Sequence, residues 1–436
     1  MDWKKEIKLS DLFKRGPKDD AEAAPAAEPK AEKPKRGFSL ARKPKEAKPP
    51  PKEKARKPKR SLSFARKPKE SPGPKPARAD RRAGTHKRLV GLKIGASSLA
   101  AARVVNNGYP ELVQLARGSL EPGIVVGGEL REPDALAEAL RAFFKANKLP
   151  RQGVRLGIAS NRIGVRTFEI SGVDDPRQLE NAIHFRAQET LPIPLEEAVL
   201  DYQILSESLD DEGVLVRKVL LVVAYRDLVD RYVAACRKAG IKLAGIDLEA
   251  FALLRALGDR PADATNAAIV VASVGSERST LAVSSGQVCE FTRIIEWGGM
   301  NLNVAIARAL DIAPSEAEPI KRSLSLLEPA ELMEGLDPEA AAKVRTAVHE
   351  ELQTFARELV SSLQFYQGQA GSLGIGEVVL TGGTAHLPGI DAELGRLMGV
   401  QVRVGDPFGR VTLGKKVQEP EQVGSLAVAI GLGIES

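Results

Sequence analysis

The chain has 436 residues and a formal net charge of +7, and this total hides two regions of opposite charge. Residues 1–88 carry 29 basic and 12 acidic side chains, whereas residues 89–436 carry 35 basic and 45 acidic ones. No run reaches the roughly 18–20 consecutive apolar residues of a membrane span, and no apolar segment follows Met1, so we expect neither a spanning helix nor a secretory signal.

The basic region, residues 1–87, predicts a disordered tail rich in Lys, Arg and Pro. It contains 13 of the 28 prolines, and it has too few large apolar residues to offset the entropy of an ordered chain. A short apolar motif lies near its start: Trp3, Ile7, Leu9, Leu12 and Phe13. This motif fits either a helix that docks on a partner or a membrane surface, or a chain end without consequence.

A segment of the tail occurs twice, since residues 38–46 return in closely similar form as residues 62–70. Both copies have an arginine three residues before a serine, which makes Ser39 and Ser63 candidate phosphorylation sites. Aromatic residues that could stack on bases are nearly absent, which argues against nucleic acid. We favour an anionic membrane surface or an acidic partner, with a solvated linker as the alternative.

The first half of the body alternates strand and helix patterns, which predicts a layered α/β fold. A buried strand starts at Arg88 and runs into a Gly/Ser turn, and further strands are expected at 99–105, 112–120, 154–160, 163–170, 198–205 and 214–224. Asp134 is expected to cap one helix, and Asp175 and Pro176 to start a second. A third helix is expected at 227–239, ended by Gly240.

The pattern then restarts at residue 267 with a strand, a turn of small residues at 275–278, and another strand, which indicates two related halves. A later strand leads into a double-glycine turn at 382–383. Glycine allows backbone N–H groups to approach a phosphate closely, so three such turns in this order favour a phosphate or nucleoside site. Apolar residues at helical spacing predict a core helix: Leu352, Phe355, Leu359, Leu363 and Tyr366.

These three turns resemble the two phosphate motifs and the adenosine motif of the actin-like ATPase superfamily, which includes FtsA, Hsp70 and sugar kinases. Within it, residues 179–202, 230–255 and 424–432 look like the PilM family of type IV pilus assembly proteins. The resemblance covers essentially all of residues 89–436 and leaves the tail out.

The resemblance implies a two-domain actin-like, ribonuclease H-like α/β fold with nucleotide between the halves and an FtsA/PilM-type 1C insert. We expect subdomain 1A at 88–169, the 1C insert at 170–244, the return of 1A and a connector at 245–265, domain 2 at 266–423, and a C-terminal helix at 424–436. It also implies ATP as the cofactor. The implied nucleotide-binding residues are Lys93, Gly95, Ala96, Ser97, Ser98, Gly275, Ser276, Glu277, Arg278, Ser279, Thr280, Glu318, Lys321, Gly382, Gly383, Thr384 and Leu387.

The sequence departs from the superfamily where Mg²⁺ would be held. The superfamily usually has an aspartate two residues before the glycine of each phosphate motif, and here those positions are Lys93 and Ser273. Losing two carboxylates removes ligands that Mg²⁺ requires, so a metal is uncertain and no catalytic residue is assigned. Three outcomes stay open: ATP bound with Lys93 in place of the metal, nucleotide bound without turnover, or no nucleotide. We favour weak or absent hydrolysis.

Other polar residues have ordinary explanations beside their functional ones. Glu318 and Lys321 fit a surface ion pair as well as a ribose or adenine contact. Asp247 and Glu249 are the nearest remaining acids, but capping or solvation would explain them, and His386 is expected to be structural. The two cysteines, Cys236 and Cys289, have no metal or redox spacing.

The resemblance therefore implies a cytoplasmic adaptor, peripheral at the inner membrane face, which binds the N-terminal peptide of PilN in a groove between subdomains 1A and 1C. It would link the pilus motor ATPases to the PilN–PilO platform, with the basic tail as a route to the membrane. The alternatives are an actin-like ATPase or kinase, and an FtsA-like membrane-tethered division scaffold. FtsA ends in an amphipathic helix, whereas this chain stops directly after its last expected core element.

Overall fold

The computed structural model describes residues 88–190, 194–258, 267–286, 288–327, 336–369, 371–418 and 423–435. The predicted tail at 1–87, with its apolar motif and with Ser39 and Ser63, lies outside these residues.

The first sheet has six strands in the order β10-β6-β1-β2-β3-β16. Strands β1 to β3 form an antiparallel meander, β6 and β10 extend it in parallel from β1, and β16 pairs with β3. The bounds are Arg88–Ile94 for β1, Ser98–Val105 for β2, Glu111–Ser119 for β3, Gln152–Ile158 for β6, Lys242–Leu248 for β10 and Thr412–Leu413 for β16. The strand β10 was not among the strands expected from the sequence.

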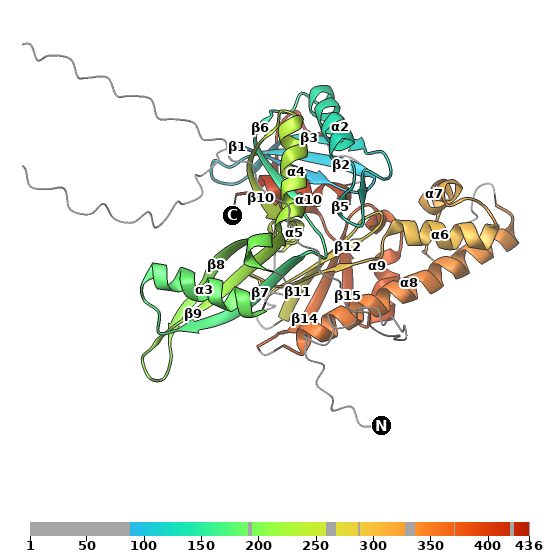
Figure 1. Cartoon of the computed structure of the whole chain (residues 1–436). Coiled ribbons are helices and arrows are strands. Elements are labelled where there is room, and N and C mark those ends of the chain that lie inside the picture. Colours follow the sequence, from blue (N-terminus) through green and yellow to red (C-terminus); the bar gives the residue numbers. More distant parts are fainter. Residues whose placement is uncertain are drawn as a thin grey trace, which may run out of the picture. The chain divides into compact units, whose positions relative to one another are not determined.

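Helices cover both faces of this sheet, because its central strands are buried on both sides (Figure 1). On one face lie α2 (Pro133–Ala146) and α4 (Arg226–Lys238), which contribute Leu136, Leu140 and Tyr232 to the core. On the other face lies α10 (Ala427–Gly433).

Helix α2 begins one residue earlier than Asp134, so the predicted cap was wrong. Pro133 occupies the first helical position, where its fixed φ is already helical, and Glu132 precedes it without a side-chain cap bond. Asp134 instead lies in the first turn and pairs with Lys238 of α4 at 2.7 Å. Asp175 behaves as predicted at α3, since its carboxylate accepts a hydrogen bond from the Arg177 backbone N–H at 3.0 Å.

A separate three-stranded antiparallel sheet has the order β7-β9-β8, with β7 at Ile163–Ser171, β8 at Ala198–Leu209 and β9 at Leu215–Tyr225. Helix α3 (Pro176–Thr190) lies on it in Figure 1, and its Leu179, Ile183 and Ala187 form a small core with the sheet. A short 3-10 turn, η1 (Leu195–Glu197), leads into β8.

The second sheet has five strands in the order β13-β12-β11-β14-β15 and repeats the layout of the first. An antiparallel meander of β11 (Ala267–Val274), β12 (Ser279–Ser284) and β13 (Cys289–Ile295) is extended in parallel by β14 (Gly374–Thr381) and β15 (Gln401–Val404). This repeat confirms the two related halves expected from the sequence.

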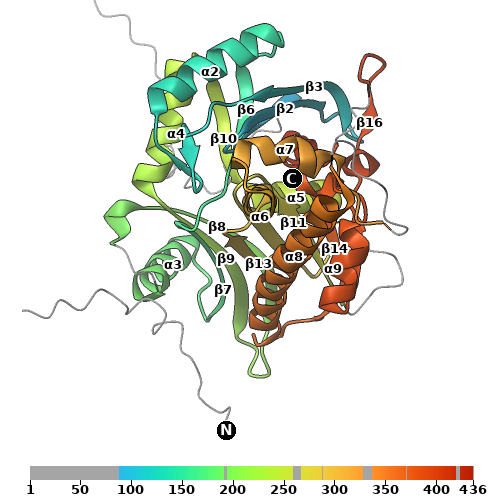
Figure 2. The same cartoon turned by 90° about the vertical axis from the view of Figure 1, so that its right-hand side faces the viewer.

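Four helices pack against the second sheet, and Figure 2 shows the longest of them, α8, running across it. They are α6 (Gly299–Leu310), α7 (Pro314–Ser323), α8 (Pro338–Gln367) and α9 (Ile390–Met398). The five apolar residues predicted for the core of α8 are all buried. The remaining short elements are β4 (Val125–Val126), β5 (Glu129–Leu130), η2 (Thr384–His386), η3 (Pro407–Arg410) and η4 (Gly424–Leu426).

Helices α5 (Glu249–Leu257) and α10 form a shared core between the two sheets (Figure 1). Their backbones approach so closely that glycine is required: a Cβ at Gly431 would lie 1.8 Å from the Ala252 carbonyl oxygen, and one at Gly91 of β1 would lie 2.0 Å from the Ala429 carbonyl oxygen. In the described part of the chain, no helix is both long and apolar enough to cross a membrane.

Candidate functional site

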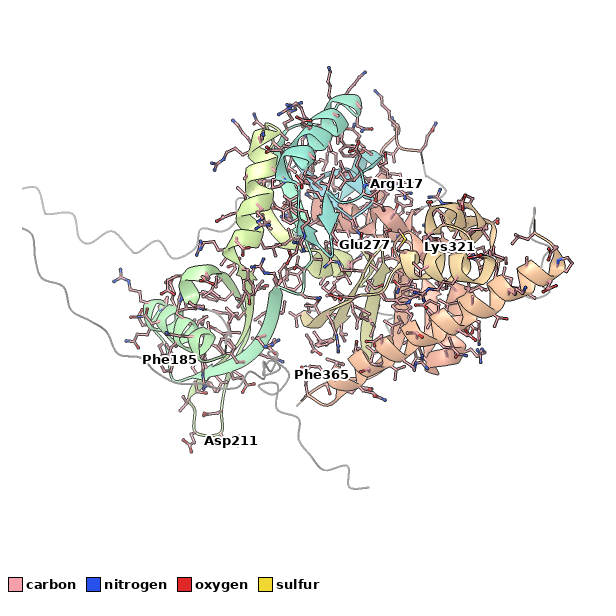
Figure 3. All side chains as sticks on the ribbon, turned by 45° about the vertical axis from the view of Figure 1, so that its right-hand side comes forward. Arg117, Phe185, Asp211, Glu277, Lys321 and Phe365 are labelled. Atoms are coloured by element: carbon pink, nitrogen blue, oxygen red, sulfur yellow. The ribbon has the colours of Figure 1, made fainter. Side chains whose placement is uncertain are left out.

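The three glycine-containing turns predicted to form a site line one cavity between the two sheets. Its volume is about 240 Å³, far above the ~10–15 Å³ that a single water requires, so it is large enough for a ligand and is not a packing defect. Figure 3 labels three of its lining residues, Arg117 on β3, Glu277 in the turn after β11, and Lys321 on α7.

The turns after β1 and β11 have the same backbone geometry. The N–H of Gly95 donates to the carbonyl of Ser98 at 2.9 Å, and the N–H of Gly275 donates to the carbonyl of Arg278 at 3.0 Å. The third turn contacts the second, because the Thr384 hydroxyl donates to the carbonyl of Gly275 at 3.1 Å. Three backbone segments that are distant in sequence therefore form one polar surface.

All of the predicted site residues line this cavity except Ser279 and Gly382. Ser279 is almost fully buried, and its hydroxyl donates to the Trp297 carbonyl at 2.7 Å. Gly382 has φ +94° and packs against the end of β11, where a Cβ would lie 2.3 Å from the Val274 carbonyl oxygen. These two residues hold the turns in place and do not face the cavity.

Lys93 faces the cavity at the position where the superfamily usually has an aspartate. Its ammonium lies 3.7 Å from the carboxylate of Glu249, and both side chains are largely buried. Solvation therefore does not explain Glu249. Asp247 is neither solvated nor a cap of α5: it accepts a hydrogen bond from the Leu248 N–H at 2.8 Å and forms a largely buried ion pair with Arg255.

Glu318 and Lys321 form more than a surface ion pair. Glu318 accepts hydrogen bonds from Lys321 at 2.7 Å, from Asn303 at 2.8 Å and from Arg322 at 2.8 Å. Burial would raise the pKa of Glu318, but these three donors outweigh it and hold the pKa at about 2. Lys321 also donates to the Gly299 carbonyl at 3.1 Å, so the network fixes α7 against the start of α6 beside the cavity.

His386 also lines the cavity, and its contacts support the structural role predicted for it. Its Nε2 accepts a hydrogen bond from the N–H of Gly424 at 3.1 Å, which joins the third turn to the start of η4. Burial, and then the charge of Arg117, lower the pKa of His386, so the ring is neutral at neutral pH.

A hairpin of the first half contacts the second turn, and no sequence motif predicted this contact. Strands β4 and β5 are joined by Gly127 and Gly128, both at positive φ, as a tight two-residue hairpin requires. The N–H of Gly127 donates to Glu277 at 3.0 Å, and Arg278 donates to the carbonyl of Ala159 at 3.2 Å. The hairpin thus brings the two halves together at the cavity.

Several lining residues were missed because no motif marks them. Arg117 lies within a strand, Tyr232 lies in the middle of α4, and Gly128 belongs to an unremarkable hairpin. The other missed residues are Ile94, Val125, Gly157, Ile158, Ala159, Gly299, Arg322 and Ser425. Apart from Ile94, which directly precedes Gly95, these residues reach the turns only through tertiary packing.

The chemistry of the lining favours an anion. Five basic side chains face three carboxylates there: Lys93, Arg117, Arg278, Lys321 and Arg322 against Glu249, Glu277 and Glu318. Among the described residues, no group of three or more His, Cys, Asp or Glu side chains is arranged to hold a metal ion. The lining therefore offers no clustered set of carboxylates for Mg²⁺, which is bound through carboxylates and water.

The cysteines do not contribute to the site. Both are buried, and burial raises the pKa of each thiol to about 12, so neither is a thiolate near neutral pH.

Comparison with known families decides the assignment. The family model for the type IV pilus assembly protein PilM matches residues 91–436. The chain belongs to the PilM family of type IV pilus assembly proteins. This confirms the predicted family and the two-domain actin-like fold.

Solved structures and curated relatives agree with this membership of the PilM family. A structure described as a PilM-PilN type IV pilus biogenesis complex has a TM-score of 0.67 and 27% sequence identity, covering 79% of this chain and 97% of that chain. The cell division protein FtsA of Escherichia coli K12 is 26% identical over 379 residues, covering 78% of this chain and 89% of FtsA. FtsA of Bacillus subtilis strain 168 is 23% identical over 319 residues, covering 64% and 70%.

Proposed function

We propose that this PilM-family protein is a nucleotide-binding adaptor of type IV pilus assembly, and that it binds ATP with little or no hydrolysis. The observation that carries the proposal is the position of the Lys93 ammonium. It lies in the cavity, two residues before the glycine of the first turn, and is 3.7 Å from the carboxylate of Glu249. A fixed cation there attracts phosphate without a metal.

The fit to a nucleotide rests on the three turns and on the positive lining. Backbone N–H groups of glycine-containing turns and excess basic charge suit a phosphate chain. The superfamily usually has Mg²⁺-binding aspartates two residues before the glycine of the first and second turns, and here these positions are Lys93 and Ser273. This arrangement supports binding more than turnover.

Calorimetric titration of the full chain with ATP tests the proposal. We expect binding of similar affinity in Mg²⁺ and in EDTA, with phosphate release close to background. An affinity that rises steeply with Mg²⁺ would contradict the role given to Lys93, and no binding of ATP in either buffer would overturn the nucleotide proposal.

We further propose that the chain binds the N-terminal cytoplasmic peptide of a PilN-like protein and so connects the platform, including a PilO-like partner, to the pilus motor ATPases. A solved relative forms a PilM-PilN complex, which supports this assignment. A second cavity lies where β6 passes into β7, against α5 and against β12 and β13 of the second sheet, and we propose it as the peptide site. Its lining is Ile158, Ala159, Ser160, Asn161, Ile163, Leu248, Ala250, Thr280, Thr292, Arg293 and Ile294.

A synthetic PilN N-terminal peptide on beads should retain the full chain, and Asn161→Trp, at an exposed side chain of the second cavity, should abolish retention by filling that cavity. Lys415→Trp, at an exposed site outside the second cavity, serves as the control for adding an indole. Retention of Asn161→Trp at the wild-type level would exclude the second cavity, and failure to retain the wild type would exclude the peptide. Genes for PilN- and PilO-like proteins next to this one would support the platform assignment.

For the tail, we propose attachment to an anionic surface at the inner face of the membrane. The +17 charge of residues 1–88 supports it, at about 1 kcal/mol for each basic residue near the surface. The full chain should sediment with anionic liposomes at low salt, and phosphomimetic Ser39→Asp with Ser63→Asp should weaken this. Equal sedimentation with neutral liposomes would contradict the proposal.

The alternatives are less well supported. An FtsA-like division scaffold has the FtsA relatives in its favour, but the PilM family model covers residues 91–436. An actin-like ATPase or kinase has less support because Lys93 and Ser273 stand where the superfamily usually has its two Mg²⁺-binding aspartates.

A further inference from the structure

Strands β1, β6 and β10 begin at the same end of the first sheet. They run parallel, with Val90 opposite Val154 and Lys242 opposite Gln152. Helices α2 and α4 lie side by side on one face of this sheet and lead into β6 and β10, so both helices end beside these strand starts (Figures 1 and 2). The cavity lined by the three glycine turns lies at the other ends of β1 and β6. The two ends of the sheet therefore present separate surfaces.

The surface at the strand starts is rich in basic side chains. Eight of them are exposed and form what we call the basic face: Arg88, Arg141, Lys145, Lys148, Arg151, Arg237, Lys238 and Lys242. Arg141 donates to the carbonyl of Lys238 at 2.9 Å, and Arg151 donates to the carbonyl of Ala239 at 3.3 Å. The N–H of Lys242 donates to the carbonyl of Arg151 at 2.7 Å. These contacts join the two helix ends and the strand starts into one surface.

Acidic residues are missing from the segments that form the basic face. The sequence has no Asp or Glu between Glu138 and Glu169, and none between Asp230 and Asp247, although residues 89–436 as a whole have more acidic than basic side chains. Among the described residues, only Lys238 of the eight bases pairs with a carboxylate, that of Asp134 at 2.7 Å. Seven positive charges are therefore left for an anion outside the chain.

The helix dipole explains only part of this charge. Bases in the last turn of a helix interact favourably with its carboxyl end, and three of the eight lie there: Lys145, Arg237 and Lys238. The effect is confined to the last turn, so it does not explain Lys148, Arg151 and Lys242, which lie beyond the helix ends.

Lys148 occupies a backbone position that does not favour lysine. Its φ is +52°, in the left-handed region where glycine or asparagine usually follows the end of a helix. The corresponding residue after α4 is Gly240, with φ +77°. A base held at a backbone cost, with its side chain exposed, indicates a role for that side chain outside the fold.

We propose that the basic face lies against an anionic phospholipid bilayer. Seven charges without an internal carboxylate partner suit a surface of many phosphate groups, where each base near the lipid adds to the attraction. Residue 87 is bonded to Arg88, so the basic tail starts from this same face. Exposed aromatic side chains that could stack on nucleic acid bases are absent from residues 141–151 and 237–242.

This inference extends the membrane attachment proposed for the tail to the folded body. With the basic face on the bilayer, the cavity at the opposite end of the first sheet would face away from the lipid. A ligand of that cavity could then exchange while the protein stays on the membrane.

Lysine footprinting of the full chain tests this orientation. The chain is acylated with an amine-reactive reagent, free and bound to vesicles of phosphatidylglycerol and phosphatidylethanolamine, and modified lysines are quantified by mass spectrometry. Lys145, Lys148 and Lys242 should react several-fold more slowly on the vesicles. Lys343, exposed on α8 of the second half, should react at the same rate in both samples.

A matched pair of triple variants tests the charge. The first removes three lysines of the basic face: Lys145→Gln, Lys148→Gly and Lys242→Gln. The control removes three exposed bases from α8 and α9: Lys343→Gln, Arg357→Gln and Arg396→Gln. The first should weaken partition into anionic vesicles at least about tenfold, since each base near the lipid contributes roughly fivefold, and the control should change it less than about twofold.

Lys148→Gly alone separates binding from folding. Glycine suits the left-handed backbone at this position, so the unfolding temperature should not fall, while partition into anionic vesicles should still weaken. Unchanged partition of both this variant and the triple variant of the basic face would overturn the proposal.

The footprint also separates the basic face from the tail. If tail lysines are protected on anionic vesicles while Lys145, Lys148 and Lys242 are not, the role of the basic face is wrong and the tail attachment stands. A full chain that does not sediment with anionic vesicles overturns both. Equal losses in the two triple variants would mean that net charge, and not this face, governs binding. Protection of the three lysines by duplex DNA, but not by vesicles, would assign the face to nucleic acid and overturn the membrane proposal.

Discussion

The turn at Gly95–Ser98 and the turn at Gly275–Arg278 occupy matching places in the two sheets. Each follows the first strand of an antiparallel meander, and each is closed by one hydrogen bond of nearly the same length. The side chains differ: the first turn has its base at Lys93, two residues before the glycine, and the second has its base at Arg278, three residues after it. The positive charge therefore precedes the glycine in the first half and follows it in the second. The backbone geometry of the two turns is alike although their charges lie at different positions.

Replacing Gly382 of the third turn, which packs against the end of β11, should have the largest effect on the free energy of unfolding. Gly382 packs against Val274, at the end of β11, and Gly382→Ala forces a Cβ to 2.3 Å from a carbonyl oxygen at positive φ. We expect a loss of about 3 kcal/mol in the free energy of unfolding. The neighbouring Gly383→Ala meets nothing within 4 Å and should cost less than ~0.5 kcal/mol. Equal unfolding midpoints would contradict the packing described for Gly382.

The turn glycines themselves give the next effect. A Cβ at Gly275 would lie 2.8 Å from the carbonyl oxygen of Arg278, whereas one at Gly95 would lie 3.2 Å from that of Ser98. Gly275→Ala should therefore destabilise by ~2 kcal/mol and Gly95→Ala by ~1 kcal/mol or less. Chemical denaturation of both variants measures the difference in the free energy of unfolding. A larger loss for Gly95→Ala than for Gly275→Ala would contradict the ranking by Cβ distance.

The side chains at the two equivalent strand positions, Lys93 and Ser273, should contribute differently to the affinity for ATP. Lys93→Met removes a cation and leaves Glu249 without its partner, so ATP affinity should fall about tenfold, or ~1.4 kcal/mol. Ser273→Ala at the matching position of β11 should change it by less than about twofold. Titration of both variants with ATP in EDTA tests this, and similar losses would mean that the position matters more than the charge.

The smallest effect concerns Glu318, which neutralises Lys321 in the second half. Its folded pKa of about 2 lies below its ordinary 4.5, so it contributes stability above pH ~4.5 that is lost as the pH falls toward 2. Because its side chain is 36% exposed, we expect no more than ~1 kcal/mol. Glu318→Gln should flatten the acid limb of a pH–stability profile. Glu339→Gln, at an exposed glutamate that pairs with Lys343 in α8, is the control for the substitution itself.

Much of the fold follows from local sequence patterns. Apolar runs ended by glycine turns marked β1, β2, β11 and β14, and helical spacing marked the buried face of α8, because these signals depend on neighbours along the chain. The start of α2 was misassigned because Pro133 and Asp134 both favour a helix start, and the proline took the first position.

The site was predictable mainly where a glycine turn marked it, with Glu318 and Lys321 on α7 as the exceptions. Ser279 and Gly382, which belong to those turns, proved to face the protein interior. Gly128, Tyr232 and the buried setting of Glu249 depend on contacts between residues more than a hundred positions apart. Glu277, for example, meets Gly127 across 150 residues.

Helix α10 has a consequence for biosynthesis. It covers one face of the first sheet, and Asn106 at the end of that sheet donates to the carbonyl of Gly433, 327 residues further along the chain. As the polypeptide leaves the ribosome, β1 and β2 emerge long before the segment that covers them. That apolar face must stay exposed, or be shielded by a chaperone, until residues 427–433 have been translated.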